Sequence, residues 1–242
     1  MRGIAFERYD RQIRVFGKNG QRKLSKSKVL IVGVGGLGCL ASLYLTAAGI
    51  GKLILIDRGR VEWSNLNRQI LYSPADIGKI KVRVASVKLK ELNPEVEIEG
   101  ICTEVNYENA EDFVKEVDLV VDGLDNYRGR FAVNRACIEK DRPFIHGAVH
   151  GMMGQMTTII PGKGPCLKCI VPGEPPALEV IPILNTTPAV IASLEVTEAI
   201  KLLTGIGSPA IGKLIIYDGE EMTFHEIRVA RRKNCEDCGY RN

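Results

Sequence analysis

Apolar and polar positions alternate along this chain in two different ways. Short uncharged runs, such as residues 29–32 and 53–56, end at glycine or aspartate, whereas the stretch 79–92 places apolar residues at helical spacing between lysines and arginines. Runs of the first kind predict buried strands, and stretches of the second kind predict amphipathic helices. Because the two kinds alternate, we expect an α/β fold with a Rossmann-like, mainly parallel sheet and helices on both faces.

The same patterns predict the individual elements. A strand–turn–helix–strand unit is expected over residues 28–57. Further strands are expected at 96–101, 118–122, 143–149, 155–160 (antiparallel), 213–217 and 222–229, and helices at 79–92, 108–116, 127–140 and 187–204. Asn126 is a good N-cap for the helix that follows it, and Thr187 with Pro188 predicts another helix start.

Two of the expected helices have a predicted buried face. The helix at 79–92 carries its apolar residues at Ile80, Val84, Val87 and Leu92. The helix at 187–204 is expected to bury Ile191, Leu194, Ala199, Leu202 and Leu203 and to present Glu195, Glu198 and Lys201 as a polar face.

Length and composition narrow the class of protein. The 242 residues are 45% hydrophobic and 26% charged, which is ordinary for a soluble globular protein. We expect one domain over 1–242, with a polar, helical N-terminal arm at 1–27 and a Gly- and Pro-rich exposed loop at 162–182. The net charge of +4 is too small to indicate nucleic-acid binding.

One uncharged stretch could be mistaken for a membrane span. Residues 29–51 contain no charge, but the four glycines between positions 33 and 38 would break a continuous helix at its centre. The N-terminal residues also lack the apolar core of a signal peptide. We therefore expect a cytoplasmic protein with no membrane association.

The most informative motif is the glycine-rich turn of the first unit. Gly33, Gly35 and Gly38 form G-x-G-x-x-G between a predicted strand and a predicted helix, and Asp57 ends the next strand. Such glycines allow the backbone to approach a phosphate at a helix N-terminus, and the acid can reach ribose hydroxyls. The turn therefore predicts a nucleotide site, although an aspartate after a strand is also a common turn former.

The charge of a bound triphosphate needs partners that this turn does not supply. The chain contains no G-x-x-x-x-G-K-[ST] motif and so has no P-loop lysine. Arg11, Arg68 and Lys81 are candidates, although each alone could equally be a solvated surface charge. Asp125 follows a predicted strand at the same edge and could hold Mg²⁺, or could serve only in a turn with the helix cap Asn126.

Four of the seven cysteines form two C-x-x-C pairs, Cys166/Cys169 and Cys235/Cys238. Two such pairs predict a tetrahedral zinc site, and the alternative of a redox C-x-x-C is weakened because neither pair opens a helix behind a strand. Four protein ligands leave no open position, so the zinc should be structural. The other three cysteines, Cys39, Cys102 and Cys137, are expected to be small buried hydrophobes. His146 and His150 are expected to be structural rather than catalytic.

Taken together, these residues resemble the MoeB/ThiF/HesA family, the prokaryotic relatives of ubiquitin-activating enzymes. The likeness covers nearly the whole chain and rests on these segments: R-Y-D-R-Q at 8–12, G-V-G-G-L-G at 33–38, Asp57, S-N-L-N-R-Q at 64–69, G-K-I-K at 78–81, G-L-D-N at 123–126 and both cysteine pairs. The resemblance implies an ATP- and Mg²⁺-dependent adenylyltransferase. It would activate the C-terminal glycine of a small ubiquitin-like sulfur-carrier protein as an acyl-adenylate.

The resemblance also implies roles for single residues. Gly36 would lie under the phosphates, with Gly33, Gly35 and Gly38 in the same turn, and Asp57 would bind the ribose. Ser64, Asn65, Arg68, Lys81 and Asn126 would contact the nucleotide, and Asp125 would bind Mg²⁺. Arg11 would reach into the site of a partner subunit, which implies a homodimer. Residues 162–187 would form the zinc knuckle and crossover loop.

One departure from the family changes the expected chemistry. Some members carry a cysteine in the loop after the first knuckle for a covalent sulfur or thioester link, but here residues 170–188 contain none. The corresponding position would fall within 179–182, most closely at Ile181. We therefore expect sulfur transfer to rest with another protein, such as a cysteine desulfurase, or with a small sulfur donor. The pathway stays open between molybdopterin, thiamin, tRNA thiolation and protein modification.

Three other functions remain compatible with parts of the sequence. An NAD-dependent oxidoreductase would use the same glycine motif and Asp57, although no hydride-transfer pair is evident and Arg68 and Lys81 would be unexplained. A family member could adenylate a different substrate, such as a modified tRNA base or a peptide. A zinc-containing module that only senses nucleotides is the non-enzymatic alternative.

Overall fold

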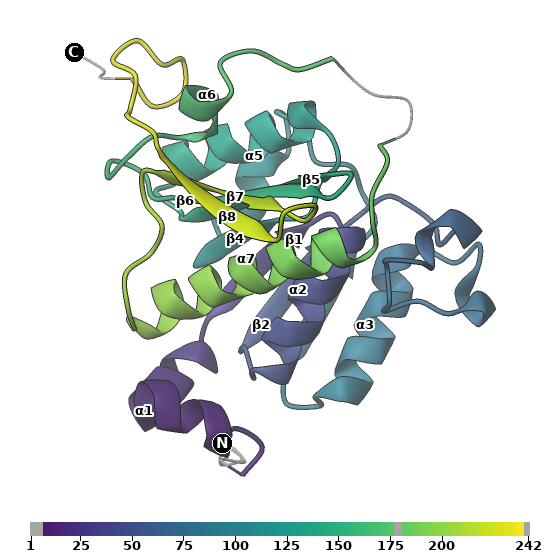
Figure 1. Ribbon diagram of the computed structural model, residues 1–242. Coiled ribbons are helices and arrows are strands. Elements are labelled where there is room, and N and C mark those ends of the chain that lie inside the picture. Colours follow the sequence, from purple (N-terminus) through teal and green to yellow (C-terminus); the bar gives the residue numbers. More distant parts are fainter. Residues whose placement is uncertain (1–6, 177–180, 240–242) are drawn as a thin grey trace.

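An eight-stranded sheet with helices on both faces makes up most of the computed structural model, which describes residues 7–176 and 181–239 (Figure 1). The strands are β1 (Lys28–Val32), β2 (Lys52–Ile56), β3 (Glu97–Ile101), β4 (Leu119–Asp122), β5 (Phe144–His150), β6 (Met153–Ile159), β7 (Lys213–Asp218) and β8 (Thr223–Arg228). The helices are α1 (Asp10–Leu24), α2 (Gly36–Ala47), α3 (Lys81–Leu92), α4 (Ala110–Val114), α5 (Tyr127–Glu139), α6 (Leu167–Ile170) and α7 (Thr186–Thr204).

The order of the strands confirms the expected fold class. Along the sheet they run β3-β2-β1-β4-β5-β6-β7-β8. Neighbours from β3 to β5 are parallel, and β6, β7 and β8 are added in antiparallel pairs. The sheet is therefore Rossmann-like and mixed, and the strand predicted at 155–160 is antiparallel as expected.

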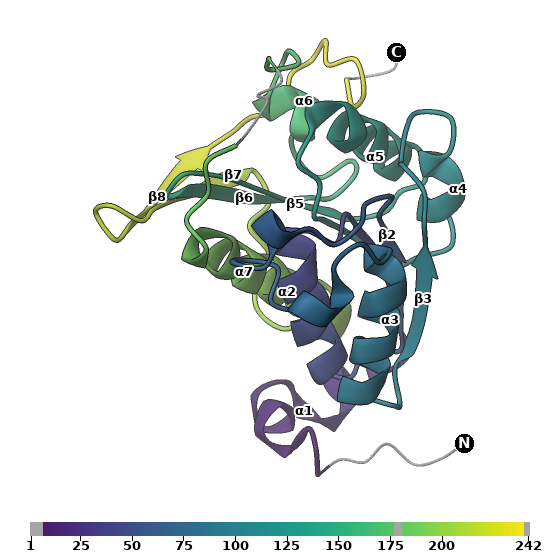
Figure 2. The same ribbon diagram turned by 90° about the vertical axis from the view of Figure 1, so that its right-hand side faces the viewer.

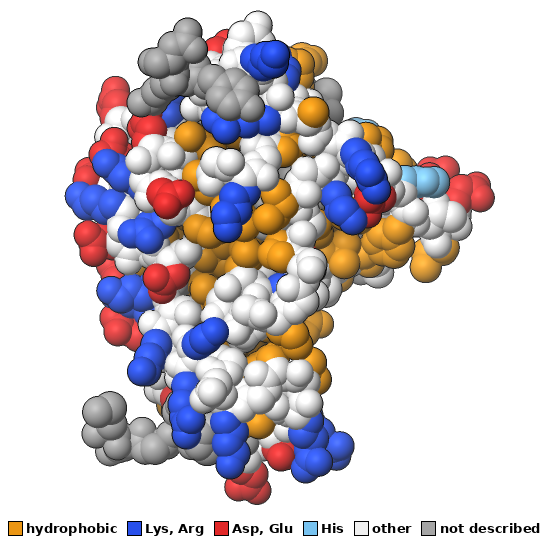
Figure 3. Space-filling view, turned by 90° about the vertical axis from the view of Figure 1, so that its left-hand side faces the viewer, with side chains coloured by type: hydrophobic (Ala, Val, Ile, Leu, Met, Phe, Trp, Pro, Cys, Tyr) orange, Lys and Arg blue, Asp and Glu red, His pale blue; other side chains and the backbone are white. Residues whose placement is uncertain are grey.

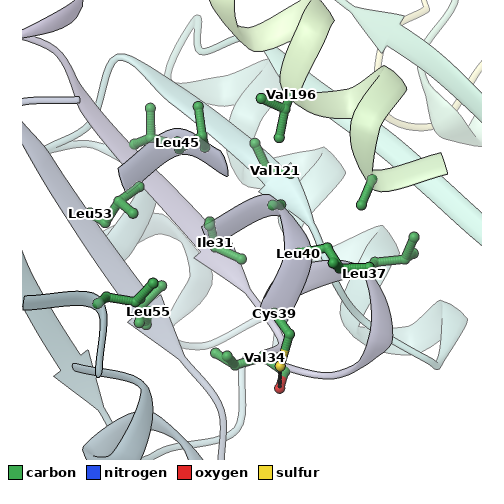
Figure 4. Close-up of a cluster of buried hydrophobic side chains, with 14 of the residues drawn as sticks. Ile31, Val34, Leu37, Cys39, Leu40, Leu45, Leu53, Leu55, Val121 and Val196 are labelled. Carbon is green, nitrogen blue, oxygen red and sulfur yellow. Dashed lines mark hydrogen bonds between the residues drawn. The ribbon is translucent and has the colours of Figure 1, made fainter. Parts of the chain in front are cut away.

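Two hydrophobic layers hold the helices to the sheet. Helices α2, α3 and α7 cover one face of the sheet, and α4 and α5 cover the other (Figure 2). Apolar side chains of each set pack with the strands they cover. In the first layer Ile31, Leu53 and Val121 from three strands meet Leu40 and Val196 from two helices (Figure 4). Burying each such side chain contributes about 1.5–3 kcal/mol relative to exposing it, so this layer holds α2 and α7 against the sheet.

The buried face of α3 differs from the one predicted. Val84 is buried as expected, but Val87 is 59% and Leu92 37% exposed, and the other buried positions are Val82, Ala85 and Leu89. The helix begins at Lys81 rather than at 79, because Ile80 pairs with Arg60 in an isolated β-bridge. The predicted stripe was therefore right at Ile80 and Val84 and wrong at Val87 and Leu92, and the later start places Lys81 at the N-terminus of the helix.

The predicted polar face of α7 is also wrong at two positions. Glu195 is completely buried and Glu198 is 3% exposed, while Ile191 and Ala199 are buried as expected. The helix packs against α2 as well as against β5 and β6, so it is covered on more than one side. Glu198 is satisfied there, because it accepts hydrogen bonds from the Ala210 amide and the Thr158 hydroxyl and pairs with Lys201.

The prediction that the loop at 162–182 is exposed holds for only part of it. It contains α6, and Cys166, Leu167 and Cys169 are buried against α5. Residues 177–180 lie outside the described part of the chain.

The far edge of the sheet is open to solvent. Every residue of β8 is exposed, and Met222, Phe224 and Ile227 contribute apolar surface where the β7–β8 hairpin projects from the body (Figure 3). Among the described residues, none of the helices combines the length and the apolar character that a membrane crossing needs.

Candidate nucleotide-binding cleft and zinc site

A cleft of about 290 Å³ lies at the carboxyl ends of the parallel strands. The chain leaves β1 towards β2 and β3 on one side, and β4 lies on the other side, so the cleft occupies the switch point where open α/β sheets bind ligands. Eight of the predicted residues line it: Gly33, Gly35, Gly36, Asp57, Arg68, Lys81, Asp125 and Asn126. Their roles toward a nucleotide stay predictions.

The glycine turn is shaped by close backbone packing. Side chains on Gly38 and Gly123 would both collide with the carbonyl group of Gly33, whose own φ of 89° also favours glycine. Helix α2 starts at Gly36 without any side-chain cap, so its first amides face the cleft free of side-chain acceptors. This is the backbone arrangement that binds phosphate at a helix N-terminus.

Asp57 both lines the cleft and holds the turn. Its Oδ2 accepts a hydrogen bond from the Val34 amide at 2.8 Å, and its Oδ1 accepts one from the Gly59 amide at 2.6 Å. The Val34 carbonyl in turn accepts one from the Tyr72 hydroxyl at 3.0 Å. The two interpretations of Asp57, turn former and cleft residue, therefore both hold.

The two basic residues come from different segments. Lys81 starts α3, and Arg68 follows a 3₁₀ turn at Trp63–Asn65. Arg68 donates to the Ser64 carbonyl at 2.9 Å, which orients its side chain along this loop. Ser64 and Asn65 do not line the cleft; the Asn65 side chain instead accepts from the Glu62 amide at 3.2 Å and closes the turn.

Asp125 and Asn126 sit where β4 gives way to α5. The Asn126 side chain accepts from the Gly129 amide at 2.8 Å, so the predicted N-cap is confirmed. Asn126 also donates to Asp125 Oδ1 at 3.2 Å. Asp125 is exposed in the cleft, and its carboxylate is of the oxygen-ligand type that Mg²⁺ prefers.

Arg130 is a cleft residue that the sequence reasoning missed. It lies on the first turn of α5, only 5% exposed, and donates to Asp122 Oδ2 at 3.0 Å and to the carbonyls of Leu124 and Gly147 at 2.5 and 3.1 Å. Arg130 stands one helical turn after the predicted cap Asn126, and this spacing could have indicated that it lies near the cleft. Arg58, Gln69 and Glu104 also line the cleft and were not singled out.

His146 has a structural environment, as expected. Its Nδ1 lies 2.6 Å from Asp122 Oδ2, and the side chain is fully buried. Burial lowers the pKa of His146, although the neighbouring Asp122 opposes this shift. A neutral ring that donates to Asp122 accounts for the contact.

Four predicted residues do not line this cleft: Arg11, the Ser64 and Asn65 described above, and Gly38, which is buried in α2. Arg11 lies exposed on α1, and no residue of that helix is among the described residues lining the cleft. Ile181 does line it, whereas positions 179 and 180 of the predicted crossover segment fall outside the described residues.

The two cysteine pairs come together in one cluster. Their Sγ atoms all lie within 4.8 Å of one another, with 3.6 Å between Cys166 and Cys235 and 3.4 Å between Cys169 and Cys238. Thiolates 2.3 Å from a tetrahedral zinc ion are roughly 3.8 Å apart, so the cluster fits zinc. All four residues are buried, which matches a closed structural site.

Further contacts connect this cluster to α5. Asp237, between the last two cysteines, accepts hydrogen bonds from Asn134 at 2.7 Å and Arg135 at 3.1 Å. The Asn134 side chain also accepts from the Leu167 amide at 2.9 Å. Both knuckles are thus attached to the helix whose N-terminus carries Asn126 and Arg130 into the cleft.

The prediction that the other three cysteines are buried holds for two of them. Cys39 and Cys137 are fully buried, and burial raises the pKa of Cys39 to about 12 and also raises that of Cys137. Cys102 is exposed, so the expectation that it is a buried hydrophobe is wrong. It follows the short strand β3, most of which is itself only partly covered.

Comparison with known proteins agrees with this geometry. The model of the ThiF family matches residues 9–238. A sulfur carrier protein adenylyltransferase of Thermus thermophilus is 38% identical over 96% of this chain and 90% of its own length, and the vegetative HesA protein of Trichormus variabilis is 38% identical over 96% and 89%. An adenylyltransferase and sulfurtransferase MOCS3 of Drosophila ananassae is 41% identical, and this chain spans 53% of it.

Solved structures give the same result. E. coli MccB superimposes with a TM-score of 0.88 at 27% identity, over 99% of this chain and 74% of MccB. MccB with ATP matches with a TM-score of 0.84 at 28% identity, over 96% of this chain and 74% of MccB. The sequence resemblance is therefore confirmed, and the chain belongs to the ThiF family.

Proposed function

We propose that this protein, an adenylyltransferase of the ThiF family, uses ATP to activate the C-terminal glycine of a small ubiquitin-like sulfur-carrier protein. The observation that carries the proposal is the convergence of the glycine turn, Arg68, Lys81 and Asp125 on one cleft. The names of the adenylyltransferase relatives and the match to MccB with ATP support the same reaction.

The reaction needs positive charge more than it needs a base. A carboxylate oxygen attacks the α-phosphorus of ATP, the bond to the β-phosphate oxygen breaks, and pyrophosphate leaves. A C-terminal carboxylate is already ionised at neutral pH, so no proton has to be removed. The barrier comes from bringing two anions together, and cationic groups and fixed dipoles lower it.

The cleft residues suit these tasks. The amides that start α2 would face phosphate oxygens, and Asp57 would accept from the ribose. Arg68 and Lys81 would neutralise the triphosphate charge. Asp125 would hold Mg²⁺, which supplies Lewis-acid stabilisation of the phosphate oxygens when bound. In this proposal the four cysteines hold a structural zinc ion, and Arg11 completes the site of a second subunit in a homodimer.

The apolar side of the cleft suits a small uncharged tail. Val149, Ile183 and Pro188 wall it with apolar side chains. The segment before α7 is held there because the Gly151 amide donates to the Pro182 carbonyl at 2.6 Å and the Leu184 amide donates to the Gly151 carbonyl at 3.0 Å. A glycine tail brings no side chain that would need a polar partner in this wall.

ATP–pyrophosphate exchange with a purified carrier protein ending in Gly-Gly tests the proposal. We expect exchange that depends on Mg²⁺ and on the carrier, and that is lost when the carrier lacks its final glycine. NAD added in place of ATP should support no reaction. Exchange that needs no carrier, or that a peptide or a tRNA supports equally well, would contradict the proposed substrate.

We further propose that the carrier leaves without a covalent link to this chain. No cysteine lies between Cys169 and Cys235, and burial holds Cys39 and Cys137 as neutral thiols. Intact-mass spectrometry under non-reducing conditions, after turnover with ATP and carrier, should show the two proteins at their separate masses. A linked species that survives in the wild type and disappears in Cys102→Ser would overturn this, because Cys102 is the exposed cysteine.

A further inference from the structure

Glu195 is buried in the middle of the fold without a polar partner. Its side chain is completely inaccessible, and neither carboxyl oxygen has a hydrogen-bond partner among the described residues. An unpaired buried carboxyl group is costly, so a protein that retains one needs a reason for it. Core packing alone does not require a carboxyl group at this position, because other buried positions of α7 carry apolar residues such as Ile191 and Ala199.

The carboxyl group lies against the backbone of β5. A Cβ placed on Gly147 would be 2.5 Å from Glu195 Oε1, so the carboxyl group occupies the space where that side chain would be. Successive residues of a strand point to opposite faces, and Ile145 belongs to the layer that contains α7. Gly147 therefore meets Glu195 on the α7 face, while His146 and Arg130 lie on the α5 face.

Arg130 joins two strands that separate at this level. Pairing of β4 with β5 stops at Val121 and Ile145. Beyond that point Arg130 connects them, donating to the Leu124 carbonyl on one side and to the Gly147 carbonyl on the other. The loop 123–126, which carries Asp125 into the cleft, is thereby attached to β5 at the residue against which Glu195 packs.

We propose that Glu195 is a positioning residue for the adenylation reaction: by packing against Gly147 it fixes the point from which Arg130 holds the loop 123–126 at the cleft. This inference rests on the proposed function. It assigns Glu195 no contact with substrate, and it requires a neutral carboxyl group. An ionised Glu195 would compete with Asp122 for Arg130 and draw it away from the Leu124 carbonyl.

The groups around Glu195 are consistent with a neutral form. Burial and the charge of Asp122 from β4 raise its pKa, and Arg130 from α5 opposes them only in part. His146 from β5 is occupied by Asp122, and Glu198 on the same helix is paired with Lys201.

Three variants test the inference in the full-length protein. Glu195→Gln keeps the shape and removes the charge, Glu195→Ala removes the packing, and Ser193→Ala changes an exposed position on the same helix. We expect Glu195→Ala to lower kcat of ATP–pyrophosphate exchange about 10- to 100-fold and to raise the Mg²⁺ concentration needed for half-maximal rate, because misplacement of a site by about 1 Å has effects of this size. Glu195→Gln should match the wild type at neutral pH and keep its activity at alkaline pH where the wild type declines.

Two results would overturn the inference. One is a Glu195→Ala protein with wild-type kcat and Mg²⁺ dependence. The other, decisive if Glu195→Ala does not fold, is a Glu195→Gln protein with the same alkaline decline as the wild type and Ser193→Ala. Failure of the proposed function is a separate result, because the wild type itself would then show no carrier-dependent exchange.

Discussion

Replacing Asp125 by alanine is expected to lower the rate of carrier-dependent ATP–pyrophosphate exchange by about 10²–10³-fold, the loss typical when one electrostatic stabiliser of a transition state is removed. Asp125 is an exposed acid of the cleft that can face Mg²⁺, and its side chain accepts a hydrogen bond from Asn126 at 3.2 Å. The measurement is initial exchange rate against Mg²⁺ concentration.

The fold should survive this substitution, because the Asn126 cap to the Gly129 amide does not involve Asp125. Glu108→Ala serves as the matched control, since Glu108 is an exposed acid that does not line the cleft. We expect the free energy of unfolding of both variants to lie within about 0.5 kcal/mol of the wild-type value, as is usual for surface substitutions. Unchanged turnover by Asp125→Ala would show that the metal is held by other residues.

Removal of zinc should have the largest effect on stability. The zinc would join two knuckles that are far apart in the chain: Cys166 and Cys235 are separated by 69 residues, as are Cys169 and Cys238. A cross-link that closes a loop of this size contributes about 4 kcal/mol by restricting the unfolded chain. For a protein of this length such a loss corresponds to a fall in Tm of roughly 8–16 °C. Thermal melts of Cys235→Ser, with zinc content measured by mass spectrometry, provide the test.

Cys102→Ser is the control for this experiment, because Cys102 is exposed and lies outside the cluster. It should retain one zinc ion per chain and the wild-type Tm. If Cys235→Ser also kept the wild-type Tm, or if the purified protein held no zinc, the cluster would not be the structural centre proposed.

Much of the fold followed from local pattern. The runs at 29–32 and 53–56 became β1 and β2, and Asn126 capped the helix where the sequence placed the cap. These elements were predictable because strand burial and helix capping depend on neighbouring residues. The later start of α3 has a tertiary cause, since Ile80 pairs with Arg60 in a bridge and the helix begins only at Lys81.

The cleft was predictable where a motif carries its residues. Asp57, Arg68 and Lys81 belong to segments of the family resemblance, and all three line the cleft. Arg130 was missed because its partners, the carbonyls of Leu124 and Gly147, are backbone groups brought near only by the separation of β4 and β5.

Residues on the long helix α7 were the hardest to place. Glu195 and Glu198 read as a polar face because helical spacing puts them beside Lys201. Burial of that side depends on β5 and β6 packing there, which no pattern within residues 187–204 reveals. Ser64 and Asn65 belong to a motif that suggested contact with a ligand, but neither lines the cleft: the Ser64 carbonyl accepts from Arg68, and the Asn65 side chain closes the turn before it.

The position of the zinc ligands has a consequence for synthesis on the ribosome. Cys169 is translated 69 residues before its neighbour Cys238, an interval of about 3–14 s at ordinary elongation rates of 5–20 residues per second. Throughout that interval the first knuckle has only half of its ligands, and its two thiols must stay reduced. The attachment of α5 through Asp237 must wait equally long, so the helix that carries Arg130 into the cleft gains its contacts with the second knuckle only late in synthesis.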